Sequence, residues 1–135
     1  MTETKSYAGL VARILLSILF ITAGYSKLGG VEGTAAYMAS QGVPGILVWP
    51  TIALELLGGL AILVGFQTRI IALALAGFSV LAALIFHFVP GDQMQMISLY
   101  KNLGLAGGFL LLAANGAGAL SVDGLIAGKA RAAAA

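Results

Sequence analysis

The sequence contains no cysteine and a single histidine. Without cysteine, the chain cannot form disulfides, carry a thiol redox pair, attach haem through thioethers or bind an iron–sulfur cluster through thiolates. One histidine cannot supply both imidazoles of a b-type haem, and it leaves too few ligands for a metal site. Because no cofactor motif is recognisable either, we expect no covalently bound cofactor and no catalysis by this chain alone.

Charge is also scarce, since only 9% of the 135 residues are charged while 60% are hydrophobic. The mean hydropathy is +1.03. A water-soluble domain of this size has too little core to bury so much apolar surface. The small surplus of seven basic over five acidic residues fits membrane topology and does not indicate nucleic-acid binding. We therefore predict a single membrane domain over residues 1–135.

Four apolar stretches reach the length of about 20 residues that a helix needs to cross a bilayer. These predicted spans cover about residues 8–27, 45–66, 70–88 and 94–115. Between the first two, Val31–Ser40 has a helix-compatible composition and ends at Gly42-Val43-Pro44. We predict a short interfacial helix there, anchored by Tyr37 and Trp49. The predicted fold class is therefore an all-α, four-transmembrane-helix bundle with one short interfacial helix.

Four spans place both termini on the same side of the membrane. That side holds Lys5, Arg13, Arg69, Lys129 and Arg131, and the other side holds Lys27 and Lys101. The positive-inside rule then predicts cytoplasmic termini. The first span, with its basic start, also fits a signal peptide, although Ala23-Gly24-Tyr25 is a poor cleavage site.

Three polar residues lie near the inner end of the predicted bundle. Arg13, Arg69 and Asn115 are expected to contact lipid headgroups, and the long stem of Arg13 can snorkel to them. After residue 116 the chain has small and polar residues and ends in an alanine run, which we predict to be nearly disordered.

Glu55 is the most informative residue, because it lies inside the second predicted span. A carboxylate at depth in a membrane costs between about 3 and over 10 kcal/mol unless it finds partners or water. Gly58 and Gly59 follow three and four residues later, on the same helical face. Because small residues allow close helix packing, this face is expected to turn inward and to bring the carboxylate with it.

Further polar residues fall at a similar depth, at about 1.5 Å per helical residue. Lys27, His87, Lys101 and Asn102 all lie in the outer half of the predicted bundle, together with Glu55. One interpretation is a structural ion pair between Glu55 and a lysine. The other is a polar pocket, open outward or sideways, in which these five residues bind a lipid headgroup or a quinone ring. For His87 alone, an interfacial position at the end of a helix is the simpler interpretation.

Several segments, taken in order, resemble one family. They are Arg13, Gly24-Tyr25-Ser26-Lys27-Leu28, Glu55-Leu56-Leu57-Gly58-Gly59, Gly65-Phe66-Gln67-Thr68-Arg69, His87, Lys101-Asn102-Leu103 and Gly116-Ala117-Gly118-Ala119-Leu120-Ser121-Val122-Asp123. Together they resemble the DoxX family of small bacterial membrane proteins, over nearly the whole chain. The resemblance implies a four-helix protein of the bacterial inner (plasma) membrane. The family is named for a subunit associated with thiosulfate:quinone oxidoreductase, and some relatives are linked to membrane oxidoreductase complexes.

Two functions follow as expectations. The first is a membrane subunit or accessory of a quinone-linked redox system, with a quinone and a redox-complex protein as partners. The second is a non-enzymatic protein that binds lipid or a small solute, or that scaffolds a complex. Membrane lipids and a homo-oligomer are further expected partners, and nucleic acid is not.

Overall fold

The computed structural model describes residues 2–135, and every regular element within them is helical. The long helices are α1 (Glu3–Leu28), α3 (Val48–Val64), α4 (Thr68–Phe86) and α5 (Gln93–Asn115), and the short ones are α2 (Val31–Ser40), the 3-10 helix η1 (Gly45–Leu47) and α6 (Val122–Ala134). Within residues 2–135, four segments are long and apolar enough to cross a membrane: α1, α4, α5, and η1 with α3 as one stretch. The prediction of an all-α fold with four spans is confirmed.

The three prolines help to set where the helices begin and end. Pro44 precedes η1, Pro50 lies in the first turn of α3, and Pro90 lies between α4 and α5. A first-turn proline is tolerated because its missing N–H has no partner within the helix anyway. The α5 helix begins after Asp92, whose carboxylate accepts hydrogen bonds from the backbone N–H groups of Met94 and Gln95 at 3.0 and 3.2 Å.

The long helices form two antiparallel pairs, α1 with α3 and α4 with α5. Glycine makes the first pair unusually close. A Cβ added to Gly24 would lie 2.8 Å from the backbone nitrogen of Leu56, and one added to Gly59 would lie 2.9 Å from Cγ1 of Ile21. Gly59 therefore packs against α1, and Gly58 packs against Ile71 and Leu75 of α4, so that this face of α3 turns inward as predicted.

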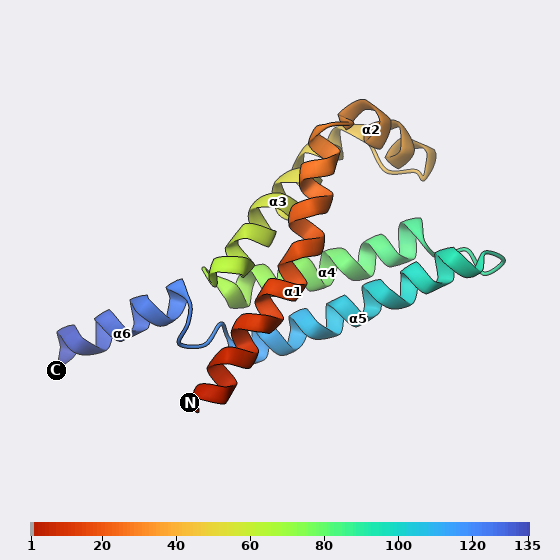
Figure 1. The fold of residues 1–135 in the computed structure, drawn as a ribbon. Coiled ribbons are helices and arrows are strands. Elements are labelled where there is room, and N and C mark those ends of the chain that lie inside the picture. Colours follow the sequence, from red (N-terminus) through yellow and green to blue (C-terminus); the bar gives the residue numbers. More distant parts are fainter. Residues whose placement is uncertain (1) are drawn as a thin grey trace.

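Figure 1 shows that the two pairs meet near the N- and C-termini and diverge toward α2. We call these two ends of the molecule the terminal end and the α2 end. Where the pairs meet, a buried cluster joins them through aromatic edge-to-face contacts. The ring of Phe20 lies 5.4 Å from that of Phe109 and 6.3 Å from that of Phe78, measured between centroids. A smaller cluster of Met38, Val48 and Ile52 attaches α2 to α3.

Two predicted segments differ in outcome. A helix does form at Val31–Ser40, but its interfacial placement remains a prediction. Its Tyr37 is half-exposed and also stacks on Phe86 of α4, with ring centroids 5.6 Å apart.

The prediction of a nearly disordered tail is wrong, because residues 122–134 form α6. Alanine is the strongest helix former, and Ser121 caps the helix by accepting a hydrogen bond from the Gly124 N–H at 3.0 Å.

Candidate functional site

A cavity of about 260 Å³ lies where the two helix pairs diverge, in the half of the molecule toward the α2 end. Helices α1 to α5 all contribute to its wall. The lining residues are Leu19, Phe20, Ala23, Lys27, Thr34, Tyr37, Met38, Thr51, Glu55, Phe78, Ser79, Ala82, Phe86, His87 and Asn102. Most of the wall is apolar or aromatic, with a few polar groups among the rings, as is usual for a binding site for a small molecule.

An ion pair between Lys27 of α1 and Glu55 of α3 forms one side of the cavity. Lys27 Nζ lies 2.8 Å from Glu55 Oε2 and donates a hydrogen bond to Oε1 at 3.1 Å. The Glu55 side chain is only 6% exposed, whereas that of Lys27 is 26% exposed. Oε2 is itself buried, and the ammonium thus lies close to both oxygens of the carboxylate.

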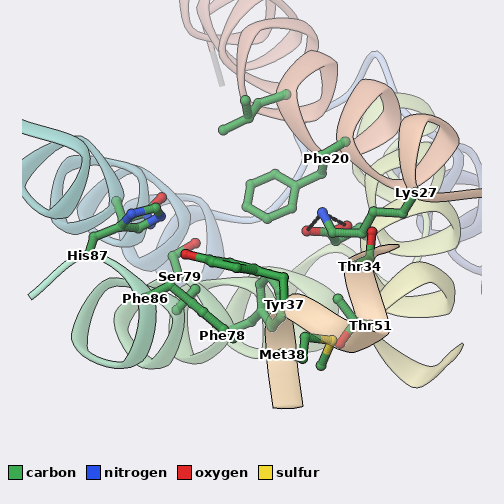
Figure 2. A pocket seen from close by; sticks show the side chains of 15 residues that line it. Phe20, Lys27, Thr34, Tyr37, Met38, Thr51, Phe78, Ser79, Phe86 and His87 are labelled. Carbon is green, nitrogen blue, oxygen red and sulfur yellow. Dashed lines mark hydrogen bonds and ion pairs between the residues drawn. The ribbon is translucent and has the colours of Figure 1, made fainter. Parts of the chain in front are cut away.

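His87 contributes a second polar group to the wall, at the end of α4. In Figure 2, His87 lies on one side of the pocket and Lys27 on the other, with the rings of Tyr37 and Phe86 between them. Nδ1 of His87 is 2.7 Å from Oε1 of Gln95 in the first turn of α5. This contact orients the imidazole, and the interfacial position predicted for His87 remains a prediction.

Of the five residues predicted to form a site, four line the cavity: Lys27, Glu55, His87 and Asn102. Lys101 does not line it and is exposed on the surface of α5. The predicted ion pair and the predicted pocket are thus parts of one arrangement. Whether these residues bind a ligand remains a prediction.

The aromatic and hydroxyl residues of the wall could not be identified from the sequence. Phe20, Phe78 and Phe86 are indistinguishable in sequence from other apolar residues of a span, and Thr34 and Thr51 carry no signal of their own. Tyr37 was expected only as an interfacial anchor. Its stacking on Phe86 joins α2 to α4 across the cavity.

A second cluster of polar groups lies at the terminal end, and there the prediction for Arg13 is wrong. Arg13 is 1% exposed and does not reach headgroups. Its Nη1 donates hydrogen bonds to the carbonyl oxygens of Leu63 at 2.6 Å and Ile62 at 3.4 Å, and its Nη2 donates to that of Leu120. The guanidinium therefore occupies the C-terminal end of α3, where free carbonyls and the helix dipole favour a cation.

Arg69 and Asp123 complete this cluster. The Nη1 of Arg69, an exposed residue, donates to the carbonyl oxygens of Ala113 and Ala114 at 2.8 and 2.6 Å, at the end of α5. The carboxylate of Asp123 accepts from the backbone N–H groups of Gln67 and Thr68, both at 2.9 Å, at the start of α4. Partial burial opposes ionisation of Asp123, but these hydrogen bonds and the nearby charge of Arg13 outweigh it and lower the pKa of this carboxyl.

A tight turn brings these groups together. Gly65 ends α3 in the left-handed region with φ of 71°, and its backbone oxygen accepts a hydrogen bond from the Asp123 N–H at 2.9 Å. A Cβ on Gly65 would lie 2.8 Å from Nη1 of Arg13. Glycine is thus required both for the backbone conformation and for the space that the guanidinium occupies.

Comparison with known proteins identifies the family. The sequence model of the DoxX family matches residues 8–88. The chain belongs to the DoxX family. It is 49% identical to inner membrane protein YqjF of Escherichia coli K12, over 93% of this chain and 97% of that protein. It is also 39% identical to inner membrane protein YphA of the same organism, over 84% of this chain and 86% of YphA.

A third relative carries a name that mentions an activity. The chain is 30% identical to "Putative oxidoreductase CatD" of Bacillus subtilis 168, over 78% of this chain and 82% of CatD. No solved structure matches the chain. Family membership and the four apolar helices show that this chain is a membrane protein of the DoxX family.

Proposed function

We propose that this protein is a membrane subunit or accessory of a quinone-linked redox system, and that the cavity binds the quinone ring. The observation that carries the proposal is the cavity itself, whose aromatic wall lies between an ion pair and an oriented imidazole. A quinone is a flat, neutral ring with a polar oxygen at each of two opposite positions. Such a ring matches apolar walls with polar groups on opposite sides.

The volume of the cavity favours a ring rather than a whole lipid. At about 260 Å³ it lies just below the range of roughly 300–1,000 Å³ that is typical of small-molecule sites. A ring fits within this space.

The name of CatD, which includes the word oxidoreductase, adds support for a redox context. Because the chain has no cysteine and one histidine, electrons would have to come from a partner protein that carries its own redox cofactor. We further propose that the protein lies in the bacterial inner membrane with both termini in the cytoplasm, which places the cavity in the outer half of the bilayer. The names of YqjF and YphA and the distribution of basic residues support this placement.

The binding of a quinone can be tested with the purified protein in phosphatidylcholine nanodiscs. A tail-less benzoquinone is titrated calorimetrically into the native protein, the His87→Ala variant and the Lys101→Ala variant. We expect saturable binding to the native protein, at least fivefold weaker binding to His87→Ala, and unchanged binding to Lys101→Ala. Lys101 is the matched control because it is polar and lies in the same half of the molecule, but does not line the cavity.

Mass spectrometry of the protein extracted in mild detergent distinguishes the two functional classes. A redox role predicts co-purified quinone together with a cofactor-bearing partner protein. Phospholipid alone, with no saturable quinone binding to the nanodisc sample, would instead favour a non-enzymatic protein that binds lipid.

The proposed topology is tested by reporter fusions at Ala135 and within the α4–α5 connection at Gly91. A reporter active only in the cytoplasm should work at Ala135 and fail at Gly91. The reverse pattern would place the cavity in the inner half of the bilayer and contradict the positive-inside assignment.

A further inference from the structure

A second hollow, a groove of about 700 Å³, lies at the terminal end and shares no lining residue with the cavity. Its walls come from the start of α4, from the connection between α5 and α6, and from α6 itself. In that connection Gly116 and Gly118 have positive φ angles of 81° and 83°. The charged side chains that line the groove, within residues 2–135, are Arg69, Asp123 and Arg131.

Arg69 is held in place although it is exposed. Both hydrogen bonds that it makes within residues 2–135 come from Nη1, which donates to the carbonyl oxygens of Ala113 and Ala114. A Cβ added to Gly116 would lie 3.3 to 3.5 Å from Nη2, Nε and Cζ of Arg69, so glycine leaves the room that the guanidinium occupies. The Nε–H and Nη2–H groups therefore stay available side by side, in the arrangement that binds two oxygens of one phosphate.

The other charges of the groove favour an anion. Both oxygens of Asp123 accept backbone N–H groups at the start of α4, at 2.9 Å each, and the charge of the nearby Arg13 also stabilises this carboxylate. Arg131, about two turns further along α6, is exposed and makes no hydrogen bond or ion pair within the described part of the chain. An anion in the groove would thus meet two arginines with free donors and one acid that the protein already stabilises.

Apolar surface of α4 adjoins these charges. Ile70 lines the groove and is 68% exposed, and Leu73, one turn further along, is 55% exposed. Because α4 is long and apolar enough to cross the membrane and begins at Thr68, Arg69 and Ile70 lie where headgroups meet hydrocarbon. A phosphate at Arg69 can therefore carry acyl chains that lie along Ile70 and Leu73. A free phosphate ion would leave this apolar surface without a partner.

We propose that the groove binds one anionic phospholipid by its phosphate, from the leaflet at the terminal end. Nε and Nη2 of Arg69 donate to two phosphate oxygens, Arg131 supplies the second positive charge, and the acyl chains lie along α4. A zwitterionic lipid presents the same phosphate together with an ammonium group, which the two arginines repel, so the anionic lipid is preferred. This site does not depend on what the cavity binds.

The test is a titration of the purified protein, in a detergent with an uncharged headgroup, followed by native mass spectrometry. The lipids are dioleoyl phosphatidylglycerol and dioleoyl phosphatidylcholine, which carry the same acyl chains and differ in net charge. We expect one phosphatidylglycerol to bind saturably and at least tenfold more tightly than phosphatidylcholine. A large molar excess of inorganic phosphate should displace less than half of the bound phosphatidylglycerol, because it makes no apolar contact.

Two substitutions on α6 provide a matched pair. Arg131→Gln removes a cation that lines the groove and should weaken binding of phosphatidylglycerol at least fivefold. Lys129→Gln removes the same charge two residues earlier, from an exposed side chain that does not line the groove, and should change binding less than twofold.

Arg69→Gln should weaken binding of phosphatidylglycerol at least tenfold, with helix content measured alongside because Arg69 also caps α5. If Arg69→Gln fails to fold, the pair on α6 still decides the question.

Three results would overturn the proposal. Equal weakening by Arg131→Gln and Lys129→Gln would show a general attraction of the basic tail to anionic lipid, with no site in the groove. Equal binding of the two lipids would show that the arginines do not select the headgroup. Complete displacement of phosphatidylglycerol by inorganic phosphate would assign the groove to a free phosphate and remove the lipid from it.

Discussion

The two ends of the molecule use buried charge in opposite ways. At the terminal end, Arg13 donates to three carbonyl oxygens from two segments, and the neighbouring Asp123 accepts two backbone N–H groups. Toward the α2 end, Glu55 is buried too, but its partner is a single, partly exposed lysine, and both residues line a cavity of about 260 Å³. A charge that contacts several backbone groups from different segments stabilises a joint, whereas an ion pair in the wall of a cavity can also orient a ligand.

The dipoles of the helices favour the charges of Arg13, Arg69 and Asp123, which form the joint at the terminal end. Arg13 lies at the C-terminus of α3 and Arg69 at the C-terminus of α5, where cations are favourable, while Asp123 lies at the N-terminus of α4, where an anion is favourable. These contacts hold the two helix pairs together where they meet. Toward the α2 end the pairs diverge in Figure 1, and there the stacking of Tyr37 on Phe86 connects α2 to α4.

Removing Arg13 should break the joint and gives the largest effect we predict. Arg13→Ala leaves carbonyls of α3 and the carbonyl of Leu120 without a donor, and it removes a positive charge that helps to lower the pKa of Asp123. We expect a loss of about 3–5 kcal/mol in the free energy of unfolding, the range for breaking a buried charged network. Chemical denaturation in detergent, followed by helix content, measures it.

The matched control is Arg131→Ala, which removes the same side chain from an exposed position on α6. It should change the free energy of unfolding by less than about 0.5 kcal/mol. Equal effects of the two substitutions would show that Arg13 acts only as a headgroup residue, as first expected from its position in the sequence.

Glu55→Gln should have a smaller effect on stability, because it disrupts a single ion pair with a partly exposed lysine. The substitution leaves Lys27 without its counter-ion, but Lys27 is partly exposed and can redirect its ammonium. We expect a loss of about 1–3 kcal/mol, measured by the same denaturation. A loss as large as that of Arg13→Ala would mean that the ion pair closes a joint too. Unchanged stability would indicate a solvated carboxylate.

Most of the fold was predictable because composition and helical spacing determine it locally. Apolar length located the four spans, and the position of Gly58 and Gly59 relative to Glu55 indicated which face of α3 turns inward. Depth along a helix is fixed by residue count, so Lys27, Glu55 and His87 could be assigned to one level. The direction in which a side chain points depends on packing, however, and neighbouring residues differ by about 100°. Lys101 and Asn102 show this, since only Asn102 lines the cavity.

The interactions that the sequence could not predict are those between distant segments. Arg13 is bonded to Leu63 and Leu120, which are 50 and 107 residues away, so its depth near the end of a span suggested headgroups instead. The alanine-rich tail suggested disorder because low complexity outweighed the helix propensity of alanine and the cap at Ser121. The residues of the cavity wall could not be predicted because most of them are apolar residues like any others in a span.

Substitution of Asp123 should have the smallest effect on the free energy of unfolding, and this effect should depend on pH. The pKa of its carboxyl is lowered in the folded protein, so its contribution to stability is fully present above the unfolded value of about 4 and is lost as pH falls through the lower, folded value. Asp123→Asn should therefore cost about 1 kcal/mol at pH 7, as for loss of a charged helix cap, and the difference from the native protein should shrink toward pH 3. The measurement is the free energy of unfolding between pH 7 and pH 3, with Glu32→Gln, at an exposed position on α2, as a control that should change little. A difference that stays constant down to pH 3 would show that Asp123 acts through the shape of its side chain and not through its charge, and it would remove the electrostatic part of the contrast between the two ends.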